Sequence, residues 1–136
     1  MKNKILIFGG SGFLGKYFCE NMLSSNSNQV TVFDKSSPDI KNKNLKFIKG
    51  DILNKPLVDK SIKKNTHIFH LAGWSDLETS NTNLEKVISQ NVQGTLNILE
   101  SLKKNKIKKF VYSSSLYVFS KNGGFYKTSK QMSEIL

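Results

Sequence analysis

A glycine-rich string near the amino terminus has the residue types and spacing of a phosphate-binding turn. The segment Gly9–Gly15 contains four glycines and lies between an apolar run and a helical pattern. Glycines permit positive φ angles and let a pyrophosphate approach the backbone, and the following helix would offer that pyrophosphate free N–H groups and the positive end of its dipole. Asp34 ends the next apolar run, where a carboxylate can accept hydrogen bonds from both ribose hydroxyls. These features predict a dinucleotide site; a purely structural glycine turn with an unrelated aspartate is the alternative.

The charges beside the expected ribose bear on which dinucleotide would bind. The carboxylate of Asp34 would repel a 2′-phosphate, whereas the neighbouring Lys35 could pair with one. We therefore expect NAD as the cofactor and keep NADP as the alternative.

Two tyrosines are each followed four residues later by a lysine, as Tyr126–Lys130 and as Tyr117–Lys121. Positions four apart share one face of a helix. Tyr126 begins a helical pattern, whereas Tyr117 falls in an expected loop. A free phenol has a pKa of about 10, so a tyrosine that acts as a base near neutral pH needs positive charge beside it. We expect Tyr126 and Lys130 to form the reactive pair.

The histidines and the cysteine do not suggest a metal site. His67 and His70 lie three apart on an expected strand and so point to opposite faces, and no carboxylate or cysteine cluster accompanies them. We expect packing and hydrogen-bonding roles for both. Cys19 is expected to be a buried structural thiol, and a single cysteine suits a reducing cytoplasm. Trp74 could line a substrate pocket or cap the core.

Short β-branched or aromatic runs alternate with helical patterns along the whole chain. Each connection is long enough for a crossover, so the alternation predicts a doubly wound α/β fold, with a parallel sheet and helices on both faces. We expect a single domain over residues 1–136. The expected strands are 4–8, 29–33, 45–48, 66–71 and 109–113, and the expected helices are 12–24, 56–63, 83–102 and 125–136.

The charge and hydropathy of the chain limit its partners. The chain has 136 residues and a formal net charge of +11, and none of its apolar runs approaches the ~18 residues of a membrane span. All 21 basic residues are lysines, with the densest run at 103–109. Without arginine the chain lacks the usual reader of guanine, so we expect no nucleic-acid partner. Attraction for phosphate-bearing ligands, RNA or acidic surfaces is the alternative. We expect a cytoplasmic protein, since no signal peptide is evident.

Several further motifs, in order, resemble the extended short-chain dehydrogenases/reductases, the group of NAD-dependent nucleotide-sugar epimerases and dehydratases. Together with the glycine string, Asp34 and the Tyr126–Lys130 segment, the matching motifs are Gly50-Asp51-Ile52, His70-Leu71-Ala72-Gly73, Asn91-Val92-Gln93-Gly94-Thr95 and Ser113-Ser114-Ser115. The resemblance implies a three-layer Rossmann domain. It also implies an enzyme that exchanges hydride between a nicotinamide cofactor and a nucleotide sugar.

The resemblance also implies roles for individual residues. Asp51 would meet the adenine amino group, residues 71–73 would run along the nicotinamide half of the cofactor, and Asn91 would steady the backbone of the active site. The implied catalytic residues are Ser115, Tyr126 and Lys130. The implied cofactor-binding residues are Gly9, Gly12, Phe13, Leu14, Gly15, Asp34, Lys35, Asp51, Ile52, Leu71, Ala72, Gly73, Asn91, Tyr126 and Lys130.

The chain departs from the family pattern in three ways. Phe8 stands where the family usually has threonine, the Ser115–Tyr126 connection is short, and the resemblance covers only the first part of such a protein. Without the family's further strands and its sugar-binding domain, we expect the fifth strand to be an exposed edge, and the chain to bind cofactor weakly with little turnover. The resemblance further implies a homodimer through helices 83–102 and 125–136. A non-catalytic module that senses the dinucleotide or binds a partner is the alternative.

Overall fold

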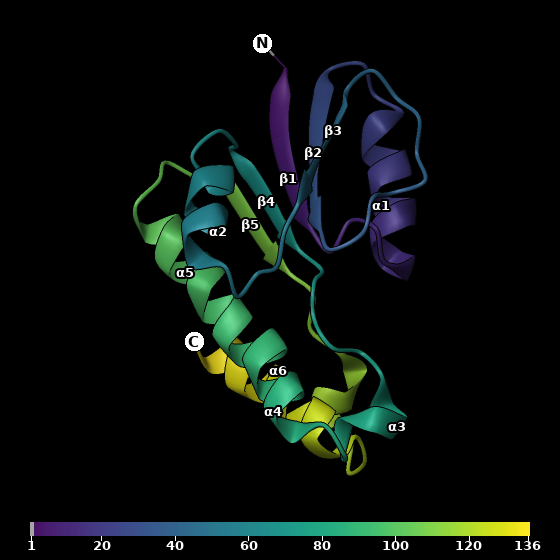
Figure 1. The fold of residues 1–136 in the computed structure, drawn as a ribbon, viewed down its shortest axis with the longest axis vertical. Coiled ribbons are helices and arrows are strands. Elements are labelled where there is room, and N and C mark those ends of the chain that lie inside the picture. Colours follow the sequence, from purple (N-terminus) through teal and green to yellow (C-terminus); the bar gives the residue numbers. More distant parts are fainter. Residues whose placement is uncertain (1) are drawn as a thin grey trace.

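Five parallel strands form one sheet in the order β3-β2-β1-β4-β5 (Figure 1). The computed structural model describes residues 2–136, so Met1, which the predicted domain includes, lies outside the described residues. The order runs outward from β1 in both directions, which places a topological switch point at the carboxyl ends of β1 and β4. The strands are β1 (Asn3–Phe8), β2 (Asn28–Asp34), β3 (Leu45–Lys49), β4 (His67–His70) and β5 (Lys109–Tyr112).

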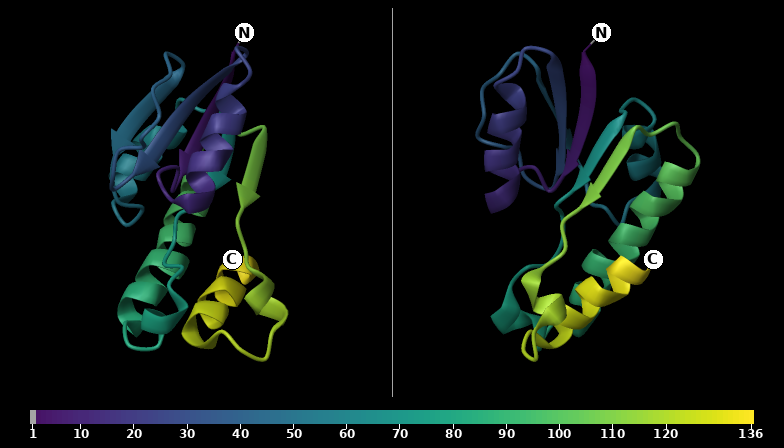
Figure 2. Two further views of the ribbon diagram at one scale, coloured as in Figure 1. Left: turned by 90° about the vertical axis from the view of Figure 1, so that its right-hand side faces the viewer. Right: turned by 180° about the vertical axis from the view of Figure 1, so that it is seen from behind.

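Helices cover both faces of this sheet, as the alternating pattern predicts. On one face lies α1 (Phe13–Leu23), and on the other lie α2 (Lys55–Ile62) and α5 (Gly94–Lys103) (Figures 1 and 2). The remaining helical segments gather beyond the carboxyl ends of the strands. They are α3 (Leu77–Ser80), α4 (Leu84–Ile88), the π-helix η1 (Ser89–Gln93), the 3₁₀-helix η2 (Leu116–Phe119) and α6 (Gly124–Ile135). The doubly wound prediction is confirmed, and β5 is an edge strand of the sheet.

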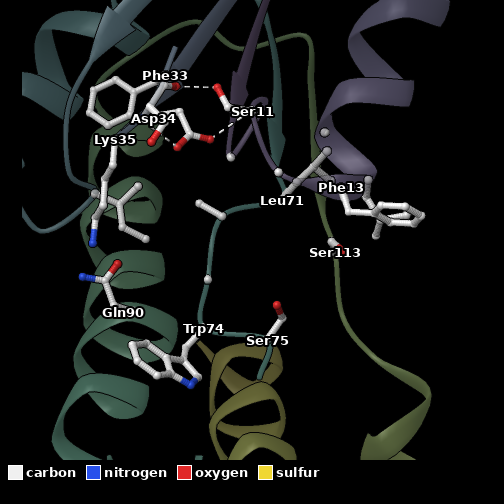
Figure 3. A pocket seen from close by; sticks show the side chains of 18 of the residues that line it. Ser11, Phe13, Phe33, Asp34, Lys35, Leu71, Trp74, Ser75, Gln90 and Ser113 are labelled. Atoms are coloured by element: carbon white, nitrogen blue, oxygen red, sulfur yellow. Dashed lines mark hydrogen bonds between the residues drawn. The ribbon is translucent and has the colours of Figure 1, made fainter. Parts of the chain in front are cut away.

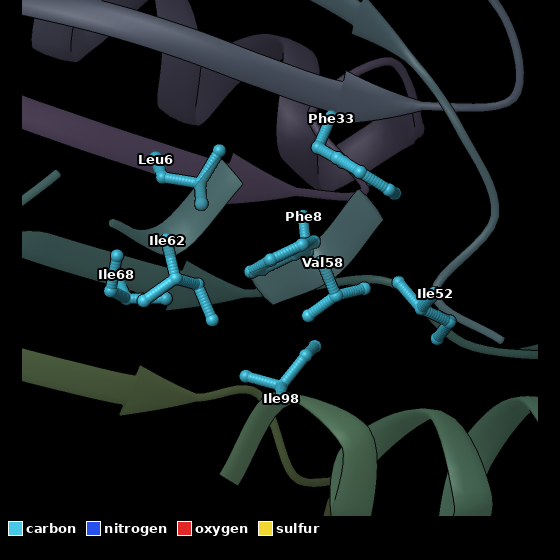
Figure 4. Packing of buried hydrophobic residues seen from close by; sticks show 8 residues of the cluster. All are labelled: Leu6, Phe8, Phe33, Ile52, Val58, Ile62, Ile68 and Ile98. Atoms are coloured by element: carbon cyan, nitrogen blue, oxygen red, sulfur yellow. The ribbon is translucent and has the colours of Figure 1, made fainter. Parts of the chain in front are cut away.

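The central strand β1 is apolar on both faces because each face meets a separate cluster of buried side chains. Leu6 and Phe8 point into the cluster that α2 and α5 cover, whereas Ile5 and Ile7 point into the cluster beneath α1. This alternation follows from the two-residue period of a strand. Figure 4 shows the first cluster, whose buried members are Leu6, Phe8, Phe33, Ile52, Val58, Ile62, Ile68 and Ile98.

The helix expected over 83–102 has the predicted extent but not the predicted regularity. Residues Ser89–Gln93 form a π-helical turn between α4 and α5. The carbonyl oxygen of Asn91 accepts hydrogen bonds from the hydroxyls of Thr95, at 2.5 Å, and Ser133, at 2.9 Å. Two side-chain hydroxyls therefore supply hydrogen bonds to the Asn91 carbonyl inside the widened turn. The short helices α3 and η2 were also not expected from the sequence.

The predicted structural roles of the cysteine and the histidines agree with their surroundings. Cys19 is completely buried, and burial raises the pKa of its thiol to about 12. His70 is buried and lies 2.9 Å from the Thr95 hydroxyl on α5, while His67 lies 3.0 Å from the hydroxyl of Thr66. Within residues 2–136, histidine, cysteine and carboxylate side chains nowhere gather in threes at metal-binding distance. No helix in this same range is long and apolar enough to cross a membrane.

Candidate functional site

A cavity of about 640 Å³ opens at the carboxyl ends of the strands, which we call the carboxyl-edge cavity (Figure 3). Its volume lies within the range of small-molecule and cofactor pockets. The cavity extends from the glycine string before α1, past the ends of β2 and β4, to α6. Of the predicted site residues, it is lined by Gly9, Gly12, Phe13, Leu14, Gly15, Asp34, Lys35, Ile52, Leu71, Ala72, Gly73, Ser115, Tyr126 and Lys130. Asp51 and Asn91 do not line it.

The glycine string makes a turn that only glycines can make at two positions. Gly9 has φ +81°, and a Cβ atom there would lie 2.5 Å from the backbone nitrogen of Ala72. A Cβ atom on Gly15 would collide with the carbonyl oxygen of Gly9. Gly12 forms the N-cap of α1 without a side-chain hydrogen bond, so the amide groups of the first turn stay open to an anion. The turn therefore leaves room and donors for a pyrophosphate.

Asp34 at the end of β2 fixes the wall next to this turn. Its Oδ2 accepts a hydrogen bond of 2.9 Å from the Ser11 backbone N–H, and its Oδ1 accepts one of 3.3 Å from the Ser36 N–H. Figure 3 shows the Asp34 carboxylate beside Ser11 at the upper end of the cavity. A carboxylate thus stands within the cavity wall, where the sequence predicts contact with a ribose.

Lys35 turns away from Asp34 and pairs with Asp51. The Nζ atom of Lys35 lies 3.0 Å from Oδ2 of Asp51. Burial alone would raise the pKa of Asp51, but the hydrogen bond from the Leu53 N–H and the contact with Lys35 outweigh burial and lower it. Gln90 adds a contact of 3.4 Å to this carboxylate. Lys35, which could pair with a 2′-phosphate, therefore forms its ion pair with Asp51 instead.

Lys130 and Tyr126 occupy one face of α6 at the other end of the cavity. Lys130 is only 6% exposed, and its Nζ donates a hydrogen bond of 2.9 Å to the Ser113 carbonyl. The same Nζ lies 4.9 Å from the ring centroid of Tyr112 and 5.9 Å from that of Tyr126. Burial lowers the pKa of Lys130 to about 8, against the opposing effect of Glu134. A cation with a lowered pKa thus faces the Tyr126 ring.

Ser115 and the two tyrosines lie around the short connection between β5 and α6. Ser115 lines the cavity, and its Oγ accepts a hydrogen bond of 3.3 Å from the Tyr117 N–H at the start of η2. Gly123 and Gly124 have φ values of +109° and +48° and make the tight return into α6. Tyr117 packs edge-on against Tyr126, with 6.2 Å between ring centroids, but does not line the cavity. The structure therefore brings the Tyr126–Lys130 pair to the cavity, and not Tyr117–Lys121.

Asn91 acts behind the cavity wall. From the π-helical turn, its Oδ1 accepts a hydrogen bond of 2.6 Å from the Trp74 N–H, and its Nδ2 donates one of 3.0 Å to the Trp74 carbonyl. Nδ2 also donates a bond of 2.8 Å to the Ser129 hydroxyl on α6. One amide side chain therefore joins the loop after β4 to the helix that carries Tyr126 and Lys130.

Several residues line the cavity that the sequence did not single out as site residues. They lie inside the recognised motifs or next to them, which is the signal that could have found them. Trp74, whose role was left open, lines the cavity; its buried indole Nε1 has no hydrogen-bond partner within residues 2–136, and Lys86 Nζ lies 6.0 Å from its ring centroid. The others are Ser11, Phe33, Ser36, Gly50, Ser75, Gln90, Ser113 and Ser114.

Comparison with known proteins identifies similar chains. The model of the NAD dependent epimerase/dehydratase family matches residues 5–134. Human short-chain dehydrogenase/reductase family 42E member 1 is 38% identical over 123 residues, which cover 86% of this chain and 30% of that protein. The UDP-glucose 4-epimerase of Pasteurella multocida is 32% identical over 127 residues, which cover 85% of this chain and 37% of the relative.

Solved structures agree with these matches. The UDP-N-acetylglucosamine 4-epimerase of Methanobrevibacter ruminantium M1, in complex with UDP-N-acetylmuramic acid, has a TM-score of 0.87 at 26% identity, over 99% of this chain and 49% of that one. Pen from Bacillus thuringiensis has a TM-score of 0.89 at 26% identity, over 98% of this chain and 44% of that one. The chain spans less than half the length of each of these four proteins.

Proposed function

This chain belongs to the NAD-dependent epimerase/dehydratase family, and on that premise we propose that its carboxyl-edge cavity binds NAD. We further propose that Ser115, Tyr126 and Lys130 serve hydride exchange with a nucleotide sugar. The observation that carries the proposal is the continuity of one cavity. Its lining contains the open glycine turn, the Asp34 carboxylate, and the three side chains that could handle a proton.

The residues present fit a dinucleotide. The turn at Gly9 and Gly15 has no space for a Cβ atom and leaves the first amides of α1 open, which suits a pyrophosphate. The carboxylate of Asp34 would accept hydrogen bonds from ribose hydroxyls and repel a 2′-phosphate, while Lys35 is paired with Asp51. These contacts support NAD over NADP.

The proton chemistry would belong to the chain's own side chains. The Tyr126 phenolate would take the proton of a sugar hydroxyl, and the resulting phenol would return it when the reaction reverses. The charge of Lys130, 5.9 Å from the Tyr126 ring, would favour the phenolate form. Ser115 would donate a hydrogen bond to the same sugar oxygen. Bound NAD would supply the acceptor and donor of the hydride.

Asn91 would contribute through position. It holds both backbone polar groups of Trp74 and also Ser129, one turn of α6 from Tyr126 and beside Lys130. This side chain would therefore help to set the distance between the loop after β4 and the reactive pair.

Calorimetry with two matched variants tests cofactor binding. We expect heat of binding with NAD, weaker binding with NADP, and about a tenfold or greater loss of NAD affinity in Asp34→Asn, because hydrogen bonds to a charged group are lost. The control is Asp39→Asn, an exposed aspartate outside the cavity lining, which should bind NAD like the wild type. If folded wild-type protein gives no heat with millimolar NAD, or binds NADP as tightly, the proposal is wrong.

A further inference from the structure

A second cavity, of about 770 Å³, lies at the opposite edge of the sheet. We call it the amino-edge cavity because its walls include the second residue of three strands, Lys4 of β1, Gln29 of β2 and Lys46 of β3. Helix α2 contributes Leu57, Lys60 and Ser61 to its lining. None of its lining residues lines the carboxyl-edge cavity. The two spaces are therefore separate sites on the same sheet.

Lysines are concentrated around this cavity. They make up six of its fifteen lining residues, compared with 21 of 136 in the whole chain and two of the residues that line the carboxyl-edge cavity. The lysine-rich composition alone does not account for this enrichment. The six are Lys4, Lys46, Lys60, Lys63, Lys64 and Lys106.

The charges around the amino-edge cavity are not neutralised by the protein. Its lining contains no aspartate or glutamate. In the described range 2–136, the ion pairs use only Lys35 and Lys55, which lie elsewhere. Lys60, Lys63 and Lys64 could complement the negative end of the α2 dipole. That effect does not explain Lys4, Lys46 and Lys106, which come from three other segments.

We infer that the amino-edge cavity is a binding site for a small ligand that carries several phosphate groups. Each lysine ammonium offers three hydrogen-bond donors and a compact positive charge, which suit phosphate oxygens. Several like charges around one space repel one another, and a ligand with several negative charges relieves that repulsion, whereas a monoanion leaves most of it. Ile48 and Leu57 add an apolar wall. Inorganic triphosphate and a nucleoside triphosphate share the required chemistry.

The test compares two triple variants that lower the net charge equally. The cavity variant is Lys46→Gln/Lys60→Gln/Lys64→Gln. The control is Lys16→Gln/Lys41→Gln/Lys121→Gln, three exposed lysines outside both cavities. Binding of sodium triphosphate, ATP and a twelve-nucleotide RNA is measured by calorimetry at constant ionic strength without Mg²⁺. Melting temperatures with and without triphosphate provide a second readout.

The result expected is specific to the cavity variant. Wild type and control should bind triphosphate equally, and the cavity variant about tenfold more weakly, since each exposed ion pair contributes modestly. Triphosphate should raise the melting temperature of wild type and control but not of the cavity variant, and NAD affinity should be the same in all three. ATP that binds like triphosphate identifies the phosphate chain as the ligand, and ATP that binds more tightly identifies a nucleotide; both support the inference. Equal weakening in both variants, no weakening in either, or binding of RNA without binding of triphosphate overturns it.

Discussion

At the scale of single residues, the candidate site depends on which tyrosine faces the cavity. Tyr126 lines it and lies within reach of the Lys130 charge, whereas Tyr117 packs against Tyr126 from outside the lining. Both tyrosines are followed by a lysine four residues later, so this spacing alone does not distinguish them as candidates for the reactive tyrosine. The difference comes from the helix that begins at Gly124 and places Lys130 one turn beyond Tyr126.

Replacing Tyr126 by phenylalanine tests the proposed proton transfer. We expect Tyr126→Phe to slow reduction of bound NAD by a UDP-sugar by about 100-fold or more, because a general base is lost. NAD affinity should change little. Single-turnover absorbance of the nicotinamide ring measures the rate, and calorimetry measures the affinity.

The matched control for that experiment is Tyr117→Phe. This change removes a neighbouring phenol that does not line the cavity, so it should preserve the rate. No reduction of bound NAD by the wild-type protein, with the same NAD affinity in both variants, would favour a non-catalytic module that senses the dinucleotide. A loss of rate in Tyr117→Phe alone would assign the reaction to the other tyrosine.

At the scale of helices and strands, β4 and α5 are joined by a buried polar contact between His70 and Thr95. Burial, and after it the charge of Lys130, lowers the pKa of His70 to about 3, from an ordinary value of 6.5. The unfolded chain therefore binds an extra proton between these two values. His70 therefore makes the free energy of unfolding depend on pH. Its contribution is greatest above pH 6.5 and is lost as the pH falls from 6.5 towards 3.

His70→Gln tests that linkage. The variant keeps a polar side chain for Thr95 but cannot take up a proton, so its melting temperature should fall less than that of wild type between pH 7 and pH 4. His67→Gln is the matched control, because it makes the same substitution at a partly exposed position of the same strand. Melting curves that run parallel for wild type and His70→Gln would contradict the role assigned to His70.

The order and type of the main elements could be predicted because local patterns determine them. The apolar run at 4–8, the glycine string and the helical pattern over 83–102 each indicate one kind of element. The π-helical turn could not be predicted in this way, because the hydroxyl of Ser133 that helps satisfy the Asn91 carbonyl comes from α6, 42 residues along the chain. The ion pair between Asp51 and Lys35 could not be predicted either, because the two residues belong to different motifs.

At the scale of the whole molecule, two cavities lie at opposite edges of the sheet and have different sequence signatures. The carboxyl-edge cavity is formed by contiguous motifs, so most of its lining could be predicted from the sequence. The amino-edge cavity is formed by lysines that are far apart, such as Lys4, Lys60 and Lys106, and only the fold brings them together. The densest lysine run, at 103–109, contributes just Lys106 to that cavity.

We propose that the chain forms a homodimer through residues 83–102 and 125–136. Large apolar side chains are exposed at this end of the molecule, including Ile135, which is 86% exposed. Light scattering should give about twice the 15.4 kDa mass of one chain, and Ile135→Glu should weaken the dimer. Tyr17→Glu, on α1 at the opposite face, should leave the mass unchanged. A wild-type mass of 15.4 kDa would contradict the proposal.

The π-helical turn at Ser89–Gln93 makes the hydrogen bonds of Asn91 depend on the length of this segment. Deleting one residue from it would restore the regular helical ladder and close the widened turn in which the hydroxyls of Thr95 and Ser133 donate to the Asn91 carbonyl. The amide of Asn91 would then lose its alignment with either Trp74 or the hydroxyls that hold its carbonyl. A single in-frame codon loss here, with the glycine string and Tyr126 untouched, would therefore disconnect the loop after β4 from α6.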